Sequence, residues 1–197
     1  MNHIYPIFDT VLTQREKETL LNQKSMVIWM AGLSGSGKST LAKSVEHNLH
    51  EQGYLTQLLD GDNLRTGINN NLGFSEVDRI ENIRRAAEVS KLFAECGIIT
   101  ICSLISPTIM IREMAKEIIG TDNYFEVFVN CPLEICEQRD VKGLYAKARN
   151  GEIKQFTGID SPFENPEKPD LELRTDLESL EQCQRRLLES ILKRIKN

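Results

Sequence analysis

The sequence contains little of what builds a zinc site or a disulfide framework. It has only three histidines in 197 residues, and its five cysteines include no Cys-x-x-Cys pair. Four of the five cysteines lie in apolar surroundings, which is more typical of buried thiols than of metal ligands. Because reduced thiols persist in the cytoplasm, we expect a cytoplasmic protein.

Long apolar runs and an excess of positive charge are also missing. No stretch approaches the roughly 18 apolar residues that a membrane span needs. The first residues show no basic segment followed by an apolar run, so we expect no membrane partner and no signal peptide. The net charge of −5 argues against a nucleic-acid partner. Any anion that this chain binds must therefore be held in a local pocket.

What the sequence does contain is typical of one globular domain, with 40% apolar and 27% charged residues. Continuous apolar runs predict buried strands near residues 26–31, 55–60, 98–102, 125–129 and 171–173. Helices are predicted near residues 38–52, 75–96, 112–119 and 133–139, and Asp176 is predicted to cap a terminal helix. This alternation predicts a three-layer α/β fold with a mostly parallel central sheet.

Residues 140–170 differ from the rest of the chain. Glycine, proline, lysine and aromatic residues are interleaved there, and hydrophobic periodicity is weak. A stretch of this length without clear regular structure inside one domain is usually functional. We therefore expect a lid loop over about residues 140–170.

The most specific motif follows the first predicted strand. Gly-Leu-Ser-Gly-Ser-Gly-Lys-Ser at residues 32–39 matches GxxxxGK[ST], the P-loop, and a predicted helix comes next. An ordinary glycine-rich turn is the alternative, but both motif and context fit phosphate binding. The residues predicted to bind ATP are Gly32, Leu33, Ser34, Gly35, Ser36, Gly37, Lys38, Ser39 and Thr40. Lys38 would reach the β- and γ-phosphates, and Ser39 would coordinate Mg²⁺, the expected cofactor.

The motif predicts a P-loop NTPase fold with a kinase domain over residues 26–197, preceded by an N-terminal extension over residues 1–25. The Asn-Lys-x-Asp motif by which regulatory GTPases read guanine is absent from the sequence. Protein kinases use a different phosphate loop. The motif alone leaves open another small-molecule or nucleotide kinase, or a non-catalytic nucleotide-binding regulator.

A second group of polar residues follows the second predicted strand. Asp62, in Asp-Gly-Asp at residues 60–62, is expected at the carboxyl edge of the sheet, where ligands of open α/β folds bind. It could orient an acceptor hydroxyl, take its proton or hold metal-bound water. The alternative is an Asx turn or a helix cap made by Asp60 or Asp62.

Several arginines gather near this point in an otherwise acidic chain. Arg65 and Arg79 suit bidentate recognition of phosphate or sulfate, and Asn82 shares a helix face with Arg79. For two further arginines we prefer a surface role, paired with neighbouring glutamates: Arg84 and Arg85. Phe74 could be a hydrophobic staple at a helix entrance or an aromatic plate for a base.

These residues together resemble the adenylylsulfate kinase (APS kinase) family over about residues 29–175. The P-loop is shared with many families. The ordered set that is more specific consists of Asp-Gly-Asp-Asn-Leu-Arg at 60–65, Leu-Gly-Phe-Ser at 72–75, Asp-Arg-Ile-Glu-Asn-Ile-Arg-Arg at 78–85, Ser-Leu-Ile-Ser-Pro at 103–107, Lys-Gly-Leu-Tyr at 142–145 and Phe-Thr-Gly-Ile at 156–159. The resemblance implies phosphoryl transfer from ATP to the 3′-hydroxyl of adenosine 5′-phosphosulfate (APS), in a homodimer.

The resemblance also implies roles for individual residues. The catalytic residues would be Asp62, Lys38, Ser106 and Lys142, and the metal ligands Ser39 and Asp62. The residues implied to bind APS are Asp62, Arg65, Phe74, Arg79, Asn82, Ile105, Ser106, Lys142, Leu144 and Phe156. Phe74 and Phe156 would sandwich the adenine. Two differences from the family pattern stand out: residues 108–111 read Thr-Ile-Met-Ile where Tyr, Arg and then an acid are usual, and Val141 replaces a proline.

Overall fold

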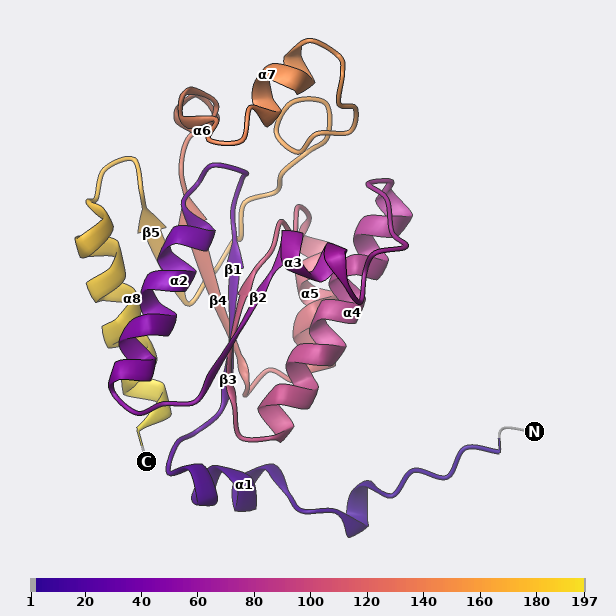
Figure 1. The fold of residues 1–197 in the computed structure, drawn as a ribbon, viewed down its shortest axis with the longest axis vertical. Helices are drawn as coiled ribbons and strands as arrows, with labels where there is room; N and C mark the ends of the chain where they lie inside the picture. Colours follow the sequence, from indigo (N-terminus) through magenta and orange to yellow (C-terminus); the bar gives the residue numbers. More distant parts are fainter. Residues whose placement is uncertain (1–2, 197) are drawn as a thin grey trace.

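Five parallel strands form the central sheet within residues 3–196, the part of the chain that the computed structural model describes. Their spatial order is β2-β3-β1-β4-β5, with β1 in the middle (Figure 1). Their bounds are Met26–Ala31 (β1), Thr56–Asp60 (β2), Ile99–Ser103 (β3), Tyr124–Asn130 (β4) and Leu171–Arg174 (β5). The predicted parallel sheet is confirmed, and each predicted strand lies within two residues of an observed one.

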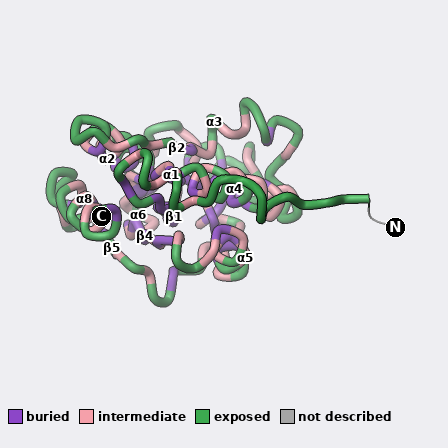
Figure 2. Tube along the Cα trace, turned by 90° about the horizontal axis from the view of Figure 1, so that it is seen from below, coloured by how far each residue is buried: buried purple, intermediate pink, exposed green. Residues whose placement is uncertain are grey.

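Helices cover both faces of this sheet, and the alternation of side chains along β1 explains why. Ile28 and Met30 face α2 (Lys38–Glu51) and α8 (Leu180–Ile195), whereas Val27 and Trp29 face α4 (Glu76–Glu95) and α5 (Ile109–Ile119). Both faces of β1 are buried, as its unbroken apolar run predicts. Figure 2 shows the buried residues gathered along the strands and the inner sides of the helices.

The predicted lid lies above the carboxyl ends of the strands and is partly ordered by its own small core. It follows α6 (Leu133–Arg139) and contains a short helix, α7 (Leu144–Arg149), which the weak periodicity did not predict. Tyr145 and Phe156 pack edge to face, with ring centroids 5.0 Å apart. The lid is therefore a packed cap.

Two predicted helix starts are corrected by the structure. The helix expected from residue 112 begins at Ile109, because the Thr108 hydroxyl accepts a hydrogen bond from the Ile111 amide. The prediction that Asp176 caps α8 is wrong. Ser179 is the cap, in a reciprocal capping box with Gln182, while the Asp176 carboxylate pairs with Arg174 at 2.9 Å.

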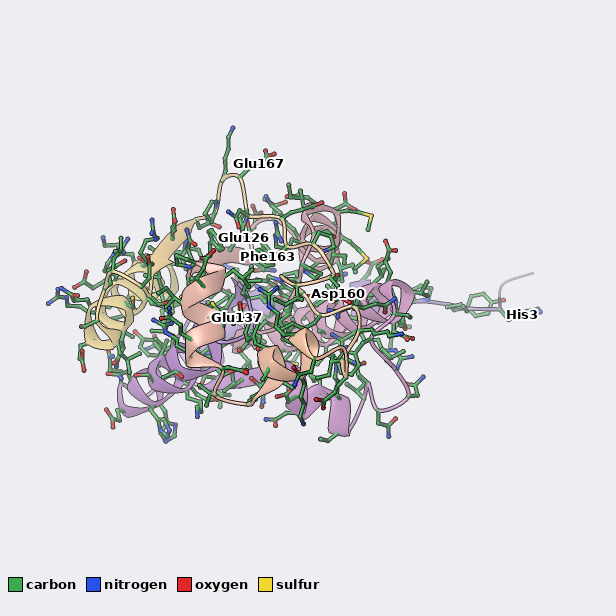
Figure 3. The ribbon with its side chains drawn as sticks, turned by 90° about the horizontal axis from the view of Figure 1, so that it is seen from above. His3, Glu126, Glu137, Asp160, Phe163 and Glu167 are labelled. Atoms are coloured by element: carbon green, nitrogen blue, oxygen red, sulfur yellow. The ribbon has the colours of Figure 1, made fainter. Side chains whose placement is uncertain are left out.

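The N-terminal extension has two parts. Residues 3–12, which include a short 3₁₀ turn (η1, Phe8–Thr10), run outward with exposed side chains, and His3 lies far from the body (Figure 3). α1 (Gln14–Leu21) and the residues after it pack under the sheet. There Gln23 is buried and donates to the carbonyls of Leu55 and Gly97, at 3.0 and 2.8 Å, while accepting from the Leu55 amide. None of the helices in the described range is long and apolar enough to cross a membrane.

Candidate active site

The glycine-rich loop links the end of β1 to the start of α2, as predicted. Gly37 precedes the helix with φ at +101°, and Gly35 has φ at +75°. A Cβ at Gly35 would lie 2.9 Å from the carbonyl oxygen of Cys136. Both positions therefore require glycine, and the loop leaves the backbone amides at the start of α2 open to a phosphate.

Lys38, the first residue of α2, is held inside this loop. Its ammonium donates to the carbonyls of Gly32 and Leu33, at 2.8 and 2.7 Å, and the residue is 7% exposed. Burial lowers the pKa of Lys38 to about 8, against smaller raising effects of Cys136 and Asp60. A phosphate beside this ammonium would offset its desolvation.

Because the pKa of Lys38 is lowered, we expect nucleotide binding to be coupled to protonation of Lys38. We expect binding of Mg·ATP at pH 9 to take up a proton, since phosphate charge raises the pKa of Lys38 again. Uptake should shrink towards pH 7.5, where Lys38 is already mostly charged. The measurement is titration calorimetry in two buffers of different ionisation enthalpy. Equal heats in both buffers at pH 9 would contradict it.

The same shift affects the stability of the ligand-free chain. Because the folded-state pKa lies below the ordinary lysine value, the unfolded chain binds more protons between about pH 8 and the usual lysine value near 10.5. The contribution of Lys38 to the free energy of unfolding therefore rises with pH through that window and is constant below it.

Hydroxyl and carboxylate oxygens meet beside the loop at a place suited to a hard cation. Ser39 Oγ donates to Asp60 Oδ2 at 2.8 Å and lies 3.1 Å from Ser103 Oγ. Oxygen ligands of this kind fit Mg²⁺. Within residues 3–196 no cluster of three or more acidic, histidine or cysteine side chains could hold a metal. A Mg²⁺ ion bound here would have nucleotide phosphates and water as its other ligands. The carboxylate next to Ser39 belongs to Asp60, whereas Asp62 was the predicted ligand.

Asp60 also explains the local turn. It caps α3 (Gly61–Thr66), a helix that was not predicted, by accepting from the Asp62 amide at 3.1 Å. The helix-cap interpretation therefore applies to Asp60. The Asp62 side chain is left outside the turn and is 72% exposed.

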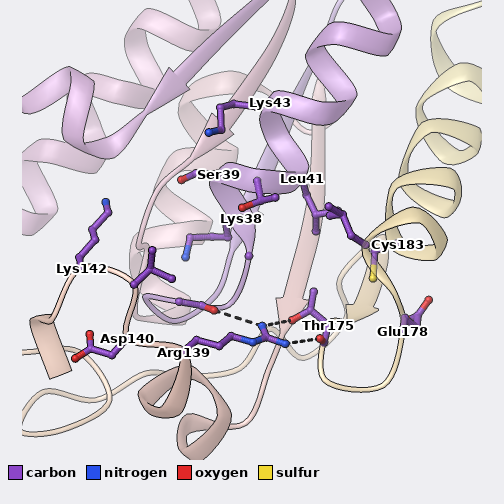
Figure 4. A pocket seen from close by; sticks show the side chains of 15 residues that line it. Lys38, Ser39, Leu41, Lys43, Arg139, Asp140, Lys142, Thr175, Glu178 and Cys183 are labelled. Carbon is purple, nitrogen blue, oxygen red and sulfur yellow. Dashed lines mark hydrogen bonds between the residues drawn. The ribbon is translucent and has the colours of Figure 1, made fainter. Parts of the chain in front are cut away.

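A cavity of about 510 Å³ extends from the P-loop towards α8 (Figure 4). Arg139 and Thr175 stand at its side: Arg139 donates to the Thr175 carbonyl at 2.6 Å, and the Thr175 hydroxyl donates to the Ser36 carbonyl at 2.8 Å. The sequence prediction missed both residues. The sequence feature that could have indicated them is their position after predicted elements. Arg139 ends α6 and Thr175 follows β5, both at the carboxyl edge of the sheet.

Asp62 and Lys142 lie between this cavity and a second group of residues, Arg65, Phe74 and Arg79, which we call the acceptor side. Lys142 lines the P-loop cavity, and its ammonium forms an ion pair with the Asp62 carboxylate. The hydrogen bond that the Lys142 ammonium donates to Asp62 raises the pKa of Lys142. Both side chains are more than half exposed, so the pair adds little stability. The pair matters for the arrangement of the site, because it places a carboxylate and an ammonium beside the P-loop cavity.

Two guanidinium groups gather around one aromatic ring on the acceptor side. Arg65 lies 4.3 Å and Arg79 lies 5.9 Å from the centroid of Phe74. Burial, and secondly the nearby Arg65, lower the pKa of Arg79. Such a concentration of positive charge is typical of an anion site. Phe74 is 59% exposed, so part of the ring remains accessible to a base.

Arg79 is also engaged with the lid. It donates to the Thr157 hydroxyl at 3.0 Å and to the Gln155 carbonyl, in addition to the Phe74 carbonyl at 2.9 Å. A second cavity of about 470 Å³ opens here. Its lining includes Phe74 and Arg79 from the acceptor side and Thr108, Met110 and Ile111, where the chain departs from the family pattern.

Some predicted acceptor residues lie deeper than expected. Ser106 is fully buried, and its hydroxyl accepts from the Trp29 indole nitrogen at 3.1 Å. Ile105 is half-buried beside it. Asn82 is 6% exposed and contacts Asn69. The Ser106 hydroxyl is thus engaged with Trp29, and its direct catalytic contact stays a prediction.

The sandwich of an adenine between Phe74 and Phe156 stays a prediction, and the two rings lie in different surroundings. Phe156 is 9% exposed and belongs to the lid core with Leu144, whereas Phe74 carries Arg65 on one face. Arg84 and Arg85 pair with Glu81, each at 2.7 Å, as the surface interpretation predicts.

The P-loop and the arginine pair lie on opposite sides of Lys142 and Asp62. The terminal phosphate of a nucleotide held at Lys38 would therefore lie near Lys142 and Asp62, and Arg65 and Arg79 could hold a second anion on the far side. This arrangement places the chain among the P-loop kinases, enzymes that move a terminal phosphoryl group from a nucleotide to a bound acceptor.

Comparison with known proteins identifies the family. The model of the family described as adenylylsulphate kinase matches residues 24–174, so the chain belongs to the adenylylsulphate kinase family. It is 63% identical to the adenylyl-sulfate kinase of Bacteroides fragilis, over 98% of this chain and 96% of that protein. It is 64% identical to the adenylyl-sulfate kinase of Bacteroides thetaiotaomicron, with the same shares covered.

A solved structure agrees with this assignment. The Mycobacterium tuberculosis APS kinase CysC, in complex with AMPPNP and APS, is 47% identical to this chain and superimposes with a TM-score of 0.82. The match covers 85% of this chain and 98% of that one. The predicted P-loop fold and the predicted family are thus confirmed.

Proposed function

We propose that the chain transfers the γ-phosphoryl group of ATP to the 3′-hydroxyl of adenosine 5′-phosphosulfate. The products are ADP and 3′-phosphoadenosine 5′-phosphosulfate, the activated form of sulfate. The observation that carries the proposal is the contact of Lys142 with Asp62, which joins the P-loop cavity to the acceptor side. Family membership supports the choice of substrates.

The nucleotide side works by positioning and charge. The amides of the P-loop and the buried Lys38 would hold the β- and γ-phosphates. Arg139 and Thr175 would border the rest of the nucleotide, because they line the same cavity. Ser39 and Asp60, together with the phosphates, would hold Mg²⁺, whose chemistry when bound is to offset negative charge on the phosphates.

The acceptor side supplies the nucleophile and its orientation. Asp62 would accept the proton of the 3′-hydroxyl, or orient that hydroxyl, as it attacks the γ-phosphorus. Arg65 and Arg79 would hold the phosphosulfate through guanidinium hydrogen bonds, and Phe74 would stack on the adenine. Lys142, on the lid, would stabilise the phosphoryl group as it passes between the two nucleotides.

Lid contacts suit this reaction because water competes with the acceptor. Arg79 already bonds to lid residues Gln155 and Thr157. An ordered lid over both nucleotides would exclude water from the γ-phosphate. Within the same proposal, the enzyme acts in the cytoplasm as a homodimer.

The test is a coupled assay of ADP release. With Mg·ATP present, we expect release to depend on adenosine 5′-phosphosulfate and to stay at background with shikimate, gluconate or nucleoside monophosphates. Release with one of these acceptors alone would favour another small-molecule kinase. Nucleotide binding without turnover on any acceptor would favour a non-catalytic regulator.

A further inference from the structure

An amide pair lies beneath the acceptor site. Asn69, in the loop between α3 and α4, is fully buried, and its Nδ2 donates to Oδ1 of Asn82 at 3.0 Å. A longer contact, 3.5 Å, joins the same nitrogen to the Asn82 backbone carbonyl. The loop is fixed there by its own backbone, since the Asn69 amide donates to the Leu64 carbonyl at 2.9 Å.

These contacts determine which way the Asn82 amide faces. A backbone carbonyl can only accept, so the Asn69 atom next to it must be the amide nitrogen. That nitrogen in turn requires the oxygen of Asn82, which leaves the Asn82 NH₂ group on the other side. Among residues 3–196 this NH₂ group has no hydrogen-bond partner. Asn82 lies one turn from Arg79 on the same face of α4, and Arg79 lines the second cavity described above, beside Phe74.

The pairing of Asn69 with Asn82 leaves one buried oxygen without a partner, which lowers the stability of the fold. In the described structure Oδ1 of Asn69 is enclosed and has no hydrogen-bond partner. A buried polar atom without a partner costs about 1–3 kcal/mol. An apolar side chain at residue 69 would avoid that cost but would leave the buried Asn82 oxygen without its donor, so the role of Asn69 is tied to the amide of Asn82.

We propose that Asn69 is a positioning residue: it holds the Asn82 amide with its NH₂ group directed at the anionic phosphosulfate of the acceptor. The inference rests on the proposed function, because it takes Asn82 as part of the acceptor site. Asn69 touches no substrate itself. It makes Asn82 a donor towards an anion, and without it the amide could turn and present an oxygen.

The substitution Asn69→Asp tests this most sharply. A carboxylate has almost the shape of the amide but only accepts, so it should draw the Asn82 NH₂ group inward and turn the Asn82 oxygen towards the acceptor. We expect KM for adenosine 5′-phosphosulfate to rise by about tenfold to a hundredfold, the range for loss of a hydrogen bond to a charged group. KM for ATP should be unchanged.

The adjacent residue offers a matched control. Asn70 is exposed, so Asn70→Asp adds the same charge to the same loop without contacting Asn82, and it should leave both KM values near wild type. Since a buried aspartate could prevent folding, Asn69→Leu is the second variant. It removes the orientation without reversing it, and a smaller rise in the acceptor KM is expected.

A double variant separates positioning from general damage. In an Asn82→Ala background, Asn69→Leu should cause no further rise in the acceptor KM. Equal losses for ATP and acceptor, or full additivity with Asn82→Ala, would overturn the inference. So would a wild-type acceptor KM in both Asn69 variants, with the proposed function left intact. A wild-type chain that neither binds nor phosphorylates adenosine 5′-phosphosulfate would instead overturn the proposed function, and the inference with it.

Discussion

Replacing Asp62 with asparagine is expected to lower kcat by about 10²–10⁴-fold, the range that general-base catalysis contributes. Asparagine keeps the shape of the side chain but cannot accept the proton of the 3′-hydroxyl. Because the side chain is 72% exposed and forms only a surface ion pair, folding should be unaffected. ATP should bind as before, since Asp62 belongs to the acceptor side.

The measurement is steady-state ADP release at saturating substrates, together with ATP titration by calorimetry. Asp122→Asn is a matched control, because Asp122 is exposed in the turn before β4 and lies at the opposite edge of the sheet. Turnover of Asp62→Asn within a few-fold of wild type would remove Asp62 from the role of base and leave it an orienting residue at most.

A comparably large effect is expected for Lys38→Met. The variant keeps a long apolar stem inside the loop but removes the charge that faces the phosphates. We expect kcat/KM for ATP to fall by about 10²–10³-fold or more, as when one preorganised donor to a developing anion is lost. Lys91→Met, on the exposed side of α4, is the control.

Two further readouts make the Lys38 prediction specific. Binding of adenosine 5′-phosphosulfate should persist, because Arg65, Arg79 and Phe74 lie on the other side of the site. The proton uptake at pH 9 should disappear at ATP concentrations high enough to saturate the variant. Wild-type kcat/KM in a folded variant would contradict the assignment of Lys38 as the phosphate contact.

The sheet and the phosphate loop were predictable because their signals are local. Strands buried on both faces read as continuous apolar runs, and β1 with six buried residues is the clearest. The P-loop needs glycine where φ is positive, so its spacing is written in the sequence. α3 and α7 contain only six residues each, too few to establish a periodic pattern.

The parts that sequence did not predict depend on contacts between distant segments. Thr108 and Ser179 were not predicted as helix caps because several nearby residues have side chains that can cap. The residue that does so is the one whose side-chain oxygen reaches a free backbone amide in the first turn of the helix. Arg139 and Thr175 are 36 positions apart and meet only because β4 and β5 are neighbours. The packing of Phe156 in the lid core could not be predicted either, because its neighbours there come from separate segments of the chain.

Gln23 limits how far the N-terminus of this domain can be shortened. Its side chain hydrogen-bonds to the amide and carbonyl of Leu55, just before β2, and to the carbonyl of Gly97, just before β3. A truncation at Met26, the start of the first strand, would remove the only side chain within residues 3–196 that hydrogen-bonds to both Leu55 and Gly97, and would leave these backbone groups without that partner. We therefore expect the independently folding unit to begin near Thr13, at the capping box of α1, and not at the first strand.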